Sequence, residues 1–317
     1  MNNTRKLATL IRPLASAAAY GLRFLPESAE KIFFKAIRRL INPSVSSELL
    51  EESLCVNLKN RGTRIDVSEV ALSQWIPVRA SLDVTDYIQR RFFLEGYPDF
   101  MPDLLRFCDS QTAFFDIGAN IGMISLGVAT VTPPGQIHSF EPVMKTFQQL
   151  KSNIDRNHPA ISCHRIALSD SDGEISFATI GADSGSATTK TDYLRKRLIA
   201  NRMSTAIQVE TCPTQRFDTF WASLKEHPGA FLTKCAVKID VEGHEIEVLG
   251  GMASFLAENK LETLIICETH WANLAKVRDV FESHAFKLVS PSEEIFESNE
   301  LFGSAKDLVF RRQSATV

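Results

Sequence analysis

The fold of this chain follows from one stretch, FFDIGANIG at residues 114–122. Its first half is an apolar run typical of a buried strand, and its second half is a glycine turn that leads into a helix. Gly118 lets the backbone turn tightly beneath a ligand, and Gly122 lets the helix approach the strand closely. A turn of this kind also links strands to helices without any ligand, so the neighbouring residues decide between the two interpretations.

One neighbour, Asp116, stands two residues before Gly118. Turns that bind dinucleotides carry G-x-G-x-x-G, usually with an apolar residue at the position of Asp116. This chain lacks the middle glycine and has an acid instead, which suits a ligand with a cationic amine, such as the methionine end of S-adenosylmethionine. The alternative is a nicotinamide-dependent oxidoreductase or epimerase on a related fold. The missing glycine and the lack of a clear Tyr-x-x-x-Lys pair argue against that alternative.

Strand-like and helix-like segments alternate along the chain from residue 112 onward. Such alternation predicts an α/β fold with a mostly parallel, Rossmann-like sheet that helices cover on both faces. A polar turn joins the last two strands, which predicts one antiparallel strand. The predicted strands are 113–117, 136–140, 161–167, 235–239, 264–267, 286–289 and 307–311, and the predicted helices are 121–131, 145–156, 214–224, 244–258 and 271–284.

Two further strands, 173–179 and 207–211, interrupt this alternation and flank a loop at 181–191 that is rich in Gly, Ser and Thr. Long loops in compact domains are often functional lids, so we expect residues 181–205 to cover the substrate. The same loop carries several basic residues. These basic residues suggest two alternatives: the loop binds an anionic partner, such as a phosphorylated sugar carrier, or its charges are simply exposed to solvent.

Acidic side chains follow three of the predicted strands. Glu141 follows the second strand, and an acid there accepts hydrogen bonds from both ribose hydroxyls of an adenosine cofactor. Asp240 and Glu242 follow the strand at 235–239, and Glu268 follows the next strand. Since the carboxyl ends of the strands in an open α/β sheet form the ligand crevice, we expect these acids to face cofactor or substrate.

Two histidines, His244 and His270, adjoin these acids in the sequence. Histidine is a natural general base near neutral pH. An alcohol acceptor must lose its proton, and we expect Asp240, His244, Glu268 and His270 to surround its oxygen, with one histidine as the base. Asp240 and Glu268 also offer the oxygen ligands that Mg²⁺ prefers, so a magnesium site is an alternative role for this pair.

The formal net charge of −3 argues against bulk nucleic-acid binding. Residues 1–44 are basic nonetheless, with eight Lys and Arg against two Glu. We interpret this arm either as a helix packed on the protein or as a helix that lies on an anionic membrane surface, and its uncharged stretches are too short to span a bilayer. A non-catalytic membrane-surface scaffold is the corresponding alternative function.

The cysteines are scattered and show no C-x-x-C spacing, which predicts reduced thiols and a cytoplasmic protein, peripheral at the membrane if the arm binds there. We expect a basic helical arm at 1–44, a mixed extension at 45–104 and a catalytic domain at 105–317. The expected elements of the extension and of the start of the domain are strands at 54–58 and 76–80 and helices at 83–94 and 98–108. The oligomeric state stays open.

Four segments together resemble the FkbM family of methyltransferases. FDIGANIG at 115–122 is similar to the family's first motif, FEP at 140–142 to its second and KIDVEGHE at 238–245 to its fourth. ALSDSDGE at 167–174 is similar to the segment after the family's third strand. The resemblance covers roughly residues 80–312, beginning with a lead-in that contains LDVTDY and EGY.

This resemblance implies a seven-stranded methyltransferase fold and S-adenosylmethionine-dependent O-methylation, commonly of sugar or natural-product hydroxyls. The expected partner is therefore a small-molecule or glycan acceptor. The turn would hold the methionine portion of the cofactor, Glu141 its ribose, and 167–170 the edge of its adenine. The implied cofactor residues are Asp116, Gly118, Ala119, Asn120, Gly122, Glu141, Pro142, Ala167, Ser169 and Asp170, and the implied substrate contacts are Glu242, Ser184 and Ser186.

Overall fold

The computed structural model of the chain forms two compact units, Met1–Tyr97 and Pro98–Val317. The sequence prediction placed the start of the catalytic domain at residue 105. The described residues are 64–71, 75–83, 86–94, 96–180, 188, 207–225, 232–269, 273–290 and 306–314.

The described residues of the first unit form an antiparallel strand pair and one helix. Strand β1 (Arg64–Ala71) pairs with β2 (Trp75–Asp83), which confirms the strand predicted at 76–80. Helix α4 (Tyr87–Leu94) starts later than the predicted helix at 83–94. The reason is local, because the Asp86 carboxylate accepts a hydrogen bond from the backbone N–H of Gln89 and so caps the helix there. The predicted arm at 1–44 and the strand at 54–58 lie outside the described residues.

A seven-stranded sheet forms the centre of the second unit, in the order β11-β12-β10-β9-β3-β4-β5. Only β12 runs antiparallel to its neighbours among these strands, which confirms the predicted fold class. The central strand β3 is buried along its whole length, as its continuous apolar run requires. The strands are β3 (Thr112–Ile117), β4 (Ile137–Phe140), β5 (Ser162–His164), β9 (Lys234–Ile239), β10 (Glu262–Thr269), β11 (Lys287–Ser290) and β12 (Lys306–Arg312).

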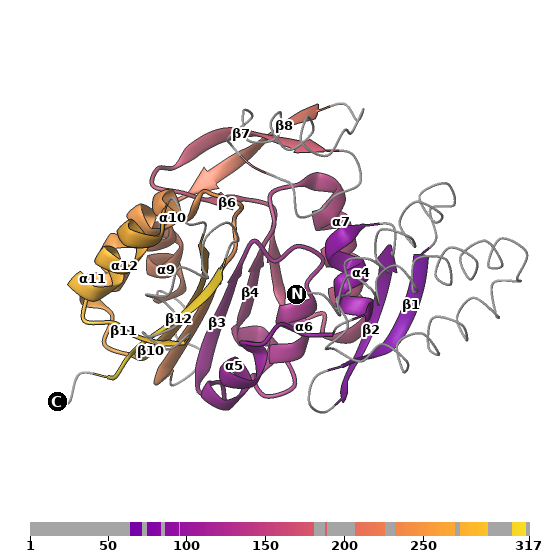
Figure 1. Ribbon diagram of the computed structural model, residues 1–317, viewed down its shortest axis with the longest axis horizontal. Helices are drawn as coiled ribbons and strands as arrows, with labels where there is room; N and C mark the ends of the chain where they lie inside the picture. Colours follow the sequence, from indigo (N-terminus) through magenta and orange to yellow (C-terminus); the bar gives the residue numbers. More distant parts are fainter. Residues whose placement is uncertain are drawn as a thin grey trace, which may run out of the picture. The chain divides into compact units, whose positions relative to one another are not determined.

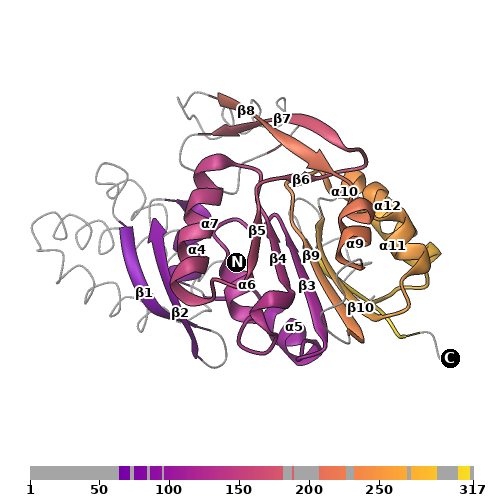
Figure 2. The same cartoon turned by 180° about the vertical axis from the view of Figure 1, so that it is seen from behind.

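Helices cover both faces of this sheet (Figures 1 and 2). Apolar side chains of the strands pack on one face against α9 to α12, in a core that contains Phe115, Phe217 and Phe281. The helices α5 to α7 lie on the opposite face, where α6 contacts β3 and β4. The helices are α5 (Met101–Phe107), α6 (Met123–Val128), α7 (Met144–Asn157), α9 (Phe217–Lys225), α10 (Glu245–Gly251), α11 (Ala253–Glu258) and α12 (Leu274–Ser283), with a 3-10 turn η1 (Pro134–Gln136) before β4.

The sequence prediction of one helix over 244–258 is wrong, because the chain forms α10 and α11 with a break at Met252. A close contact accompanies the break. A Cβ at Gly251 would lie 2.0 Å from the carbonyl oxygen of Ser169, so the end of α10 packs directly on another backbone segment. The glycine pair before Met252 permits this contact and also weakens a continuous helix.

Three strands form a second, smaller sheet in the order β6-β8-β7. They are β6 (Ala167–Leu168), β7 (Gly173–Ile180) and β8 (Ile207–Gln215), so the predicted extra strands are confirmed. Two predictions fail here. The predicted strand at 161–167 divides between β5 and β6, which belong to different sheets, and residues 214–215 end β8 rather than begin a helix. Figures 1 and 2 show this small sheet beyond one end of the larger one.

No helix in the described part of the chain is both long and apolar enough to cross a membrane. The five described cysteines are all free thiols, as the sequence predicts for them.

A stacked histidine pair lies in the aromatic core beneath α9. The His138 ring stacks on Phe115 with centroids 5.3 Å apart, and its Nδ1 lies 3.3 Å from Nε2 of His164. Phe220 meets both histidine rings edge-on. Burial lowers the pKa of both histidines, so the folded protein holds them neutral.

Acidification is therefore expected to destabilise the fold through His138. Burial lowers the pKa of His138 to about 4, whereas a histidine in the unfolded chain titrates near about 6.5. Because the unfolded chain then binds more protons, the free energy of unfolding falls as the pH drops from about 6.5 towards 4, by up to about 1.4 kcal/mol per pH unit. His138→Phe keeps the ring stack and should flatten this slope in urea unfolding at several pH values. An unchanged slope in the variant would contradict this assignment.

Candidate active site

The glycine turn after β3 is held by close backbone contacts. Gly118 has φ +78°, and a Cβ there would lie 1.8 Å from the carbonyl oxygen of Asp240. The backbone N–H groups of Gly118 and Ala119 both donate to the carbonyl of Phe140. Gly122, with φ +87°, begins α6 and packs against Leu150. The turn is thus joined to the ends of both neighbouring strands, β4 and β9.

Asp116 lies beneath this turn, with no exposed surface. Its carboxylate accepts a 2.6 Å hydrogen bond from the Ser125 hydroxyl and lies 3.7 Å from the ammonium of Lys238. Burial raises the pKa of Asp116, although Lys238 and Ser125 act in the opposite direction. Asp116 therefore supports the turn from below, and any effect on a cofactor amine would act through the turn.

Lys238 is a functional candidate that the sequence interpretation missed. Its ammonium donates to the carbonyl of Gly118 at 3.1 Å and pairs with the Asp240 carboxylate at 3.1 Å, while its side chain is 7% exposed. Burial opposes its charge, but Asp240 and Asp116 outweigh burial and raise the pKa of Lys238. The signal was present in the sequence, because a lysine inside an apolar strand needs a buried partner, and Lys238 is in register with Asp116.

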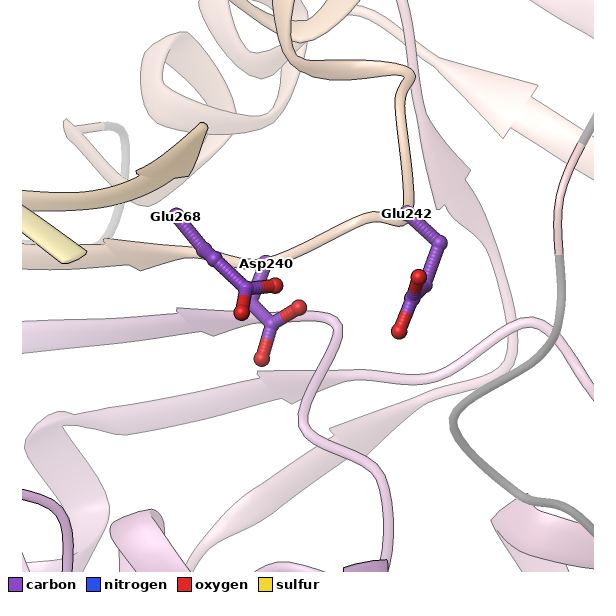
Figure 3. A group of neighbouring side chains, drawn as sticks. All are labelled: Asp240, Glu242 and Glu268. Carbon is purple, nitrogen blue, oxygen red and sulfur yellow. The ribbon is translucent and has the colours of Figure 1, made fainter. Parts of the chain in front are cut away.

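Three carboxylates meet where β9 and β10 end (Figure 3). One oxygen from each of Asp240, Glu242 and Glu268 lies within 4.8 Å of the others. Figure 3 shows the Asp240 and Glu268 carboxyl groups side by side, with Glu242 facing them from farther along the same loop as Asp240. The charge of Asp240, then burial, raises the pKa of Glu268 to about 10, and Glu268 shares a hydrogen bond with Asp240. The structure thus brings together three of the strand-end acids that the sequence singled out.

Magnesium at Asp240 and Glu268 stays a prediction. Carboxylate oxygens are the ligands that Mg²⁺ prefers, and Glu242 adds a third. However, the ammonium of Lys238 already lies 3.1 Å from Asp240. The hydrogen bond between Asp240 and Glu268 also lets these two acids lie together with a single negative charge.

Glu141 closes the turn from the side of β4. Its carboxylate accepts hydrogen bonds from the backbone N–H of Asn120 at 3.0 Å and of Val143 at 2.9 Å. Burial raises the pKa of Glu141 to about 8. Pro142, which follows, is half-buried. Each carboxylate oxygen uses one acceptor position in these bonds and keeps a second for a ligand.

The ring of His244 contacts Ser169 and Glu247. Its Nε2 is 3.0 Å from the Ser169 hydroxyl, and its Nδ1 is 3.6 Å from the Glu247 carboxylate. Ser169 is buried and Asp170 is exposed, directly after Ala167 and Leu168 of β6. The predicted base His244 therefore faces the segment that the resemblance assigns to adenine.

Thr188 contacts the loop that carries the acids. Thr188 forms a backbone bridge with Ala178 of β7, and its hydroxyl donates to the carbonyl of Glu242 at 2.9 Å. Glu242 itself has φ +50°, an unusual conformation for a residue with a side chain. Three predicted site residues, Ser184, Ser186 and His270, lie outside the described part of the chain.

The sheet order and the strand-end acids define an α/β fold with a candidate ligand site at the carboxyl ends of its strands. The chain belongs to the Methyltransferase FkbM domain family, which matches residues 116–288, more than half of its length. It is 29% identical over 192 residues to the hexuronic acid methyltransferase AglP of Haloferax volcanii, covering 61% of this chain and 70% of that protein.

It is also 26% identical over 212 residues to the 31-O-demethyl-FK506 methyltransferase FkbM of Streptomyces tacrolimicus, covering 59% of this chain and 77% of that protein. A crystal structure of methyltransferase FkbM from Methylobacillus flagellatus KT aligns with a TM-score of 0.41 and 14% identity, over 88% of this chain and 58% of that one.

Proposed function

We propose that this methyltransferase transfers a methyl group from S-adenosylmethionine to a hydroxyl group of a sugar, a glycan or glycolipid, or a natural product. The observation that carries the proposal is the turn after β3. Glu141 and the Phe140 carbonyl hold its backbone on one side, and Lys238 holds it on the other. In an open α/β sheet, a turn of this kind beside strand-end acids forms a nucleotide cofactor site.

The relatives support the acceptor class. AglP is named for hexuronic acid, and the Streptomyces protein for an oxygen of FK506. Both names point to small organic acceptors, and the second to an oxygen nucleophile. We infer a hydroxyl acceptor for this chain, held near the acids at the ends of β9 and β10.

Binding of S-adenosylmethionine tests the cofactor assignment. We expect calorimetry to show binding by the wild type and a loss of tenfold or more in Glu141→Ala, because the ribose would lose its hydrogen bonds to this carboxyl group, each worth about 0.5–1.5 kcal/mol. Glu258→Gln, an exposed acid at the end of α11, serves as the control and should bind normally. Binding of NAD in place of S-adenosylmethionine, or unaltered binding by a folded Glu141→Ala, would reject the assignment.

A further inference from the structure

We propose that Thr188 is a positioning residue of the active site: its hydroxyl fixes the turn at 241–244 so that the Glu242 carboxylate meets those of Asp240 and Glu268. The inference rests on the proposed function and deepens it, because Glu242 is a predicted contact of the acceptor. Thr188 acts through the backbone of the turn rather than on the reacting atoms.

The turn at 241–244 has an uncommon backbone conformation. Its two central residues, Glu242 and Gly243, have φ of +50° and +96°, and the backbone N–H of His244 donates to the carbonyl of Val241 at 3.3 Å. Positive φ at both central positions is the mark of a type I′ turn, which usually carries Asn-Gly or Asp-Gly. Glycine adopts this conformation readily, but a residue with a Cβ is strained there. Contacts outside the turn are therefore needed to hold Glu242 in place.

The contact with Thr188 falls on the peptide group that decides the type of turn. The Thr188 hydroxyl donates to the carbonyl of Glu242 at 2.9 Å, and this carbonyl belongs to the central peptide between Glu242 and Gly243. In a type II′ turn, φ is positive at the first central residue only, so the two types differ by a flip of this peptide. A flip would turn the carbonyl away from Thr188. The hydrogen bond therefore favours the observed turn over the flipped one.

Two backbone hydrogen bonds fix Thr188 itself. Its N–H donates to the carbonyl of Ala178 at 3.0 Å, and its carbonyl accepts from the N–H of Ala178 at 2.9 Å. Ala178 lies in β7, which pairs with β8 from Gly173 to Ile180. Thr188 is 3% exposed, and a hydrogen bond shielded from water is stronger than an exposed one. The small sheet thus supplies the support from which this hydroxyl reaches the turn.

Asp240 and Glu242 are held in different ways, although they share a loop. The backbone N–H of Asp240 donates to the carbonyl of Ile117 at the end of β3, at 3.0 Å, so the large sheet fixes its position. Glu242 lies two residues farther along, where the turn sets the direction of the side chain. One of its carboxylate oxygens lies within 4.8 Å of oxygens from Asp240 and Glu268 (Figure 3). Loss of the Thr188 hydroxyl should therefore displace Glu242 and leave Asp240 and the cofactor turn in place.

Crystal structures of the wild type and two variants test this positioning without any acceptor. Thr188→Val keeps a branched side chain of similar size but removes the donor, so the peptide between Glu242 and Gly243 should be flipped or take more than one orientation. Thr188→Ser keeps the donor and should show the wild-type turn. A wild-type turn in Thr188→Val, or a flipped turn in both variants, would overturn the proposal.

Turnover measures what the displacement does to the acceptor. The probe is D-glucuronic acid, a member of the hexuronic acids for which AglP is named, with radiolabelled S-adenosylmethionine as the donor. Thr188→Val should raise the KM for this acceptor by about three- to tenfold, the worth of one hydrogen bond. Thr188→Ser should restore that KM to within about twofold of wild type, and both variants should bind S-adenosylmethionine within about twofold of wild type.

Thr263→Val is the matched control. The Thr263 hydroxyl is also buried and donates to a backbone carbonyl, that of Leu261, at 2.9 Å, but it lies at the start of β10 rather than at the end that carries Glu268. Its loss should lower the free energy of unfolding and leave the acceptor KM unchanged. An equal rise of KM in Thr263→Val and Thr188→Val, or no rescue by Thr188→Ser, would overturn the proposal. Failure of the wild type to bind S-adenosylmethionine would instead overturn the proposed function, and the crystal structures would still decide the role of Thr188.

Discussion

Alanine at position 118 is expected to abolish S-adenosylmethionine binding and to lower the free energy of unfolding by about 3 kcal/mol. The left-handed backbone at Gly118 alone costs a residue with a Cβ about 1–2 kcal/mol. The added Cβ would also lie 1.8 Å from the Asp240 carbonyl oxygen, so the turn and the end of β9 must separate. That movement would break the contact between the Gly118 carbonyl and Lys238.

Two other glycines make this prediction specific. Gly135 has open space where a Cβ would lie, so Gly135→Ala should leave both stability and binding unchanged. Gly122 also has a left-handed backbone, at φ +87°, but its Cβ would clash only with the tip of the Leu150 side chain, at 2.6 Å, which can move, and would be in ordinary contact with Ile154. The cost of Gly122→Ala should therefore be smaller than that of Gly118→Ala. Urea unfolding and calorimetry on the three variants measure the order of the losses in stability and in S-adenosylmethionine binding. Equal losses at positions 118 and 135 would contradict the argument.

The succession of strands and helices along the chain was predictable because each central strand is an apolar run buried on both faces. Strands β3 and β9 are examples, and their ends were predicted to within one residue. The break between α10 and α11 was less predictable, since it depends on the contact between Gly251 and the Ser169 carbonyl. The division of 161–167 between two sheets likewise depends on β6 pairing with β8, far along the chain.

The candidate site was predictable where a residue's role depends on its position at a strand end. Asp240 and Glu268 meet because parallel neighbours end at the same edge of the sheet. The catalytic role of His244 stays a prediction, because closeness in the sequence does not fix the direction of a side chain. His244 begins α10, and its ring turns to Ser169. Asp116 stays a predicted cofactor residue, and strand alternation places its side chain against Ser125 of α6.

Lys238→Met is expected to be the most destabilising substitution near the site. It leaves the buried Asp116 without its cation and removes the partner of Asp240. Breaking a buried ion pair in this way costs about 3–5 kcal/mol. Lys234→Met is the matched control on the same strand. Lys234 pairs with Asp109 at a partly exposed position, so its loss should cost less than about 1 kcal/mol.

The Lys238→Met deficit is the free energy of unfolding that the variant loses relative to wild type. Its pH dependence shows whether Lys238 stabilises the fold through its charge or through its packing. Burial already raises the pKa of Asp116, and loss of the ammonium should raise it further. When the pKa of a carboxyl group is higher in the folded protein than in the unfolded chain, the free energy of unfolding falls as the pH rises through the folded pKa. The deficit in urea unfolding should therefore be largest at pH 8 and shrink towards pH 5. Adding Asp116→Asn should recover part of it at pH 8, because one uncompensated charge is gone. A deficit that is constant with pH and unaffected by Asp116→Asn would mean that Lys238 only fills space.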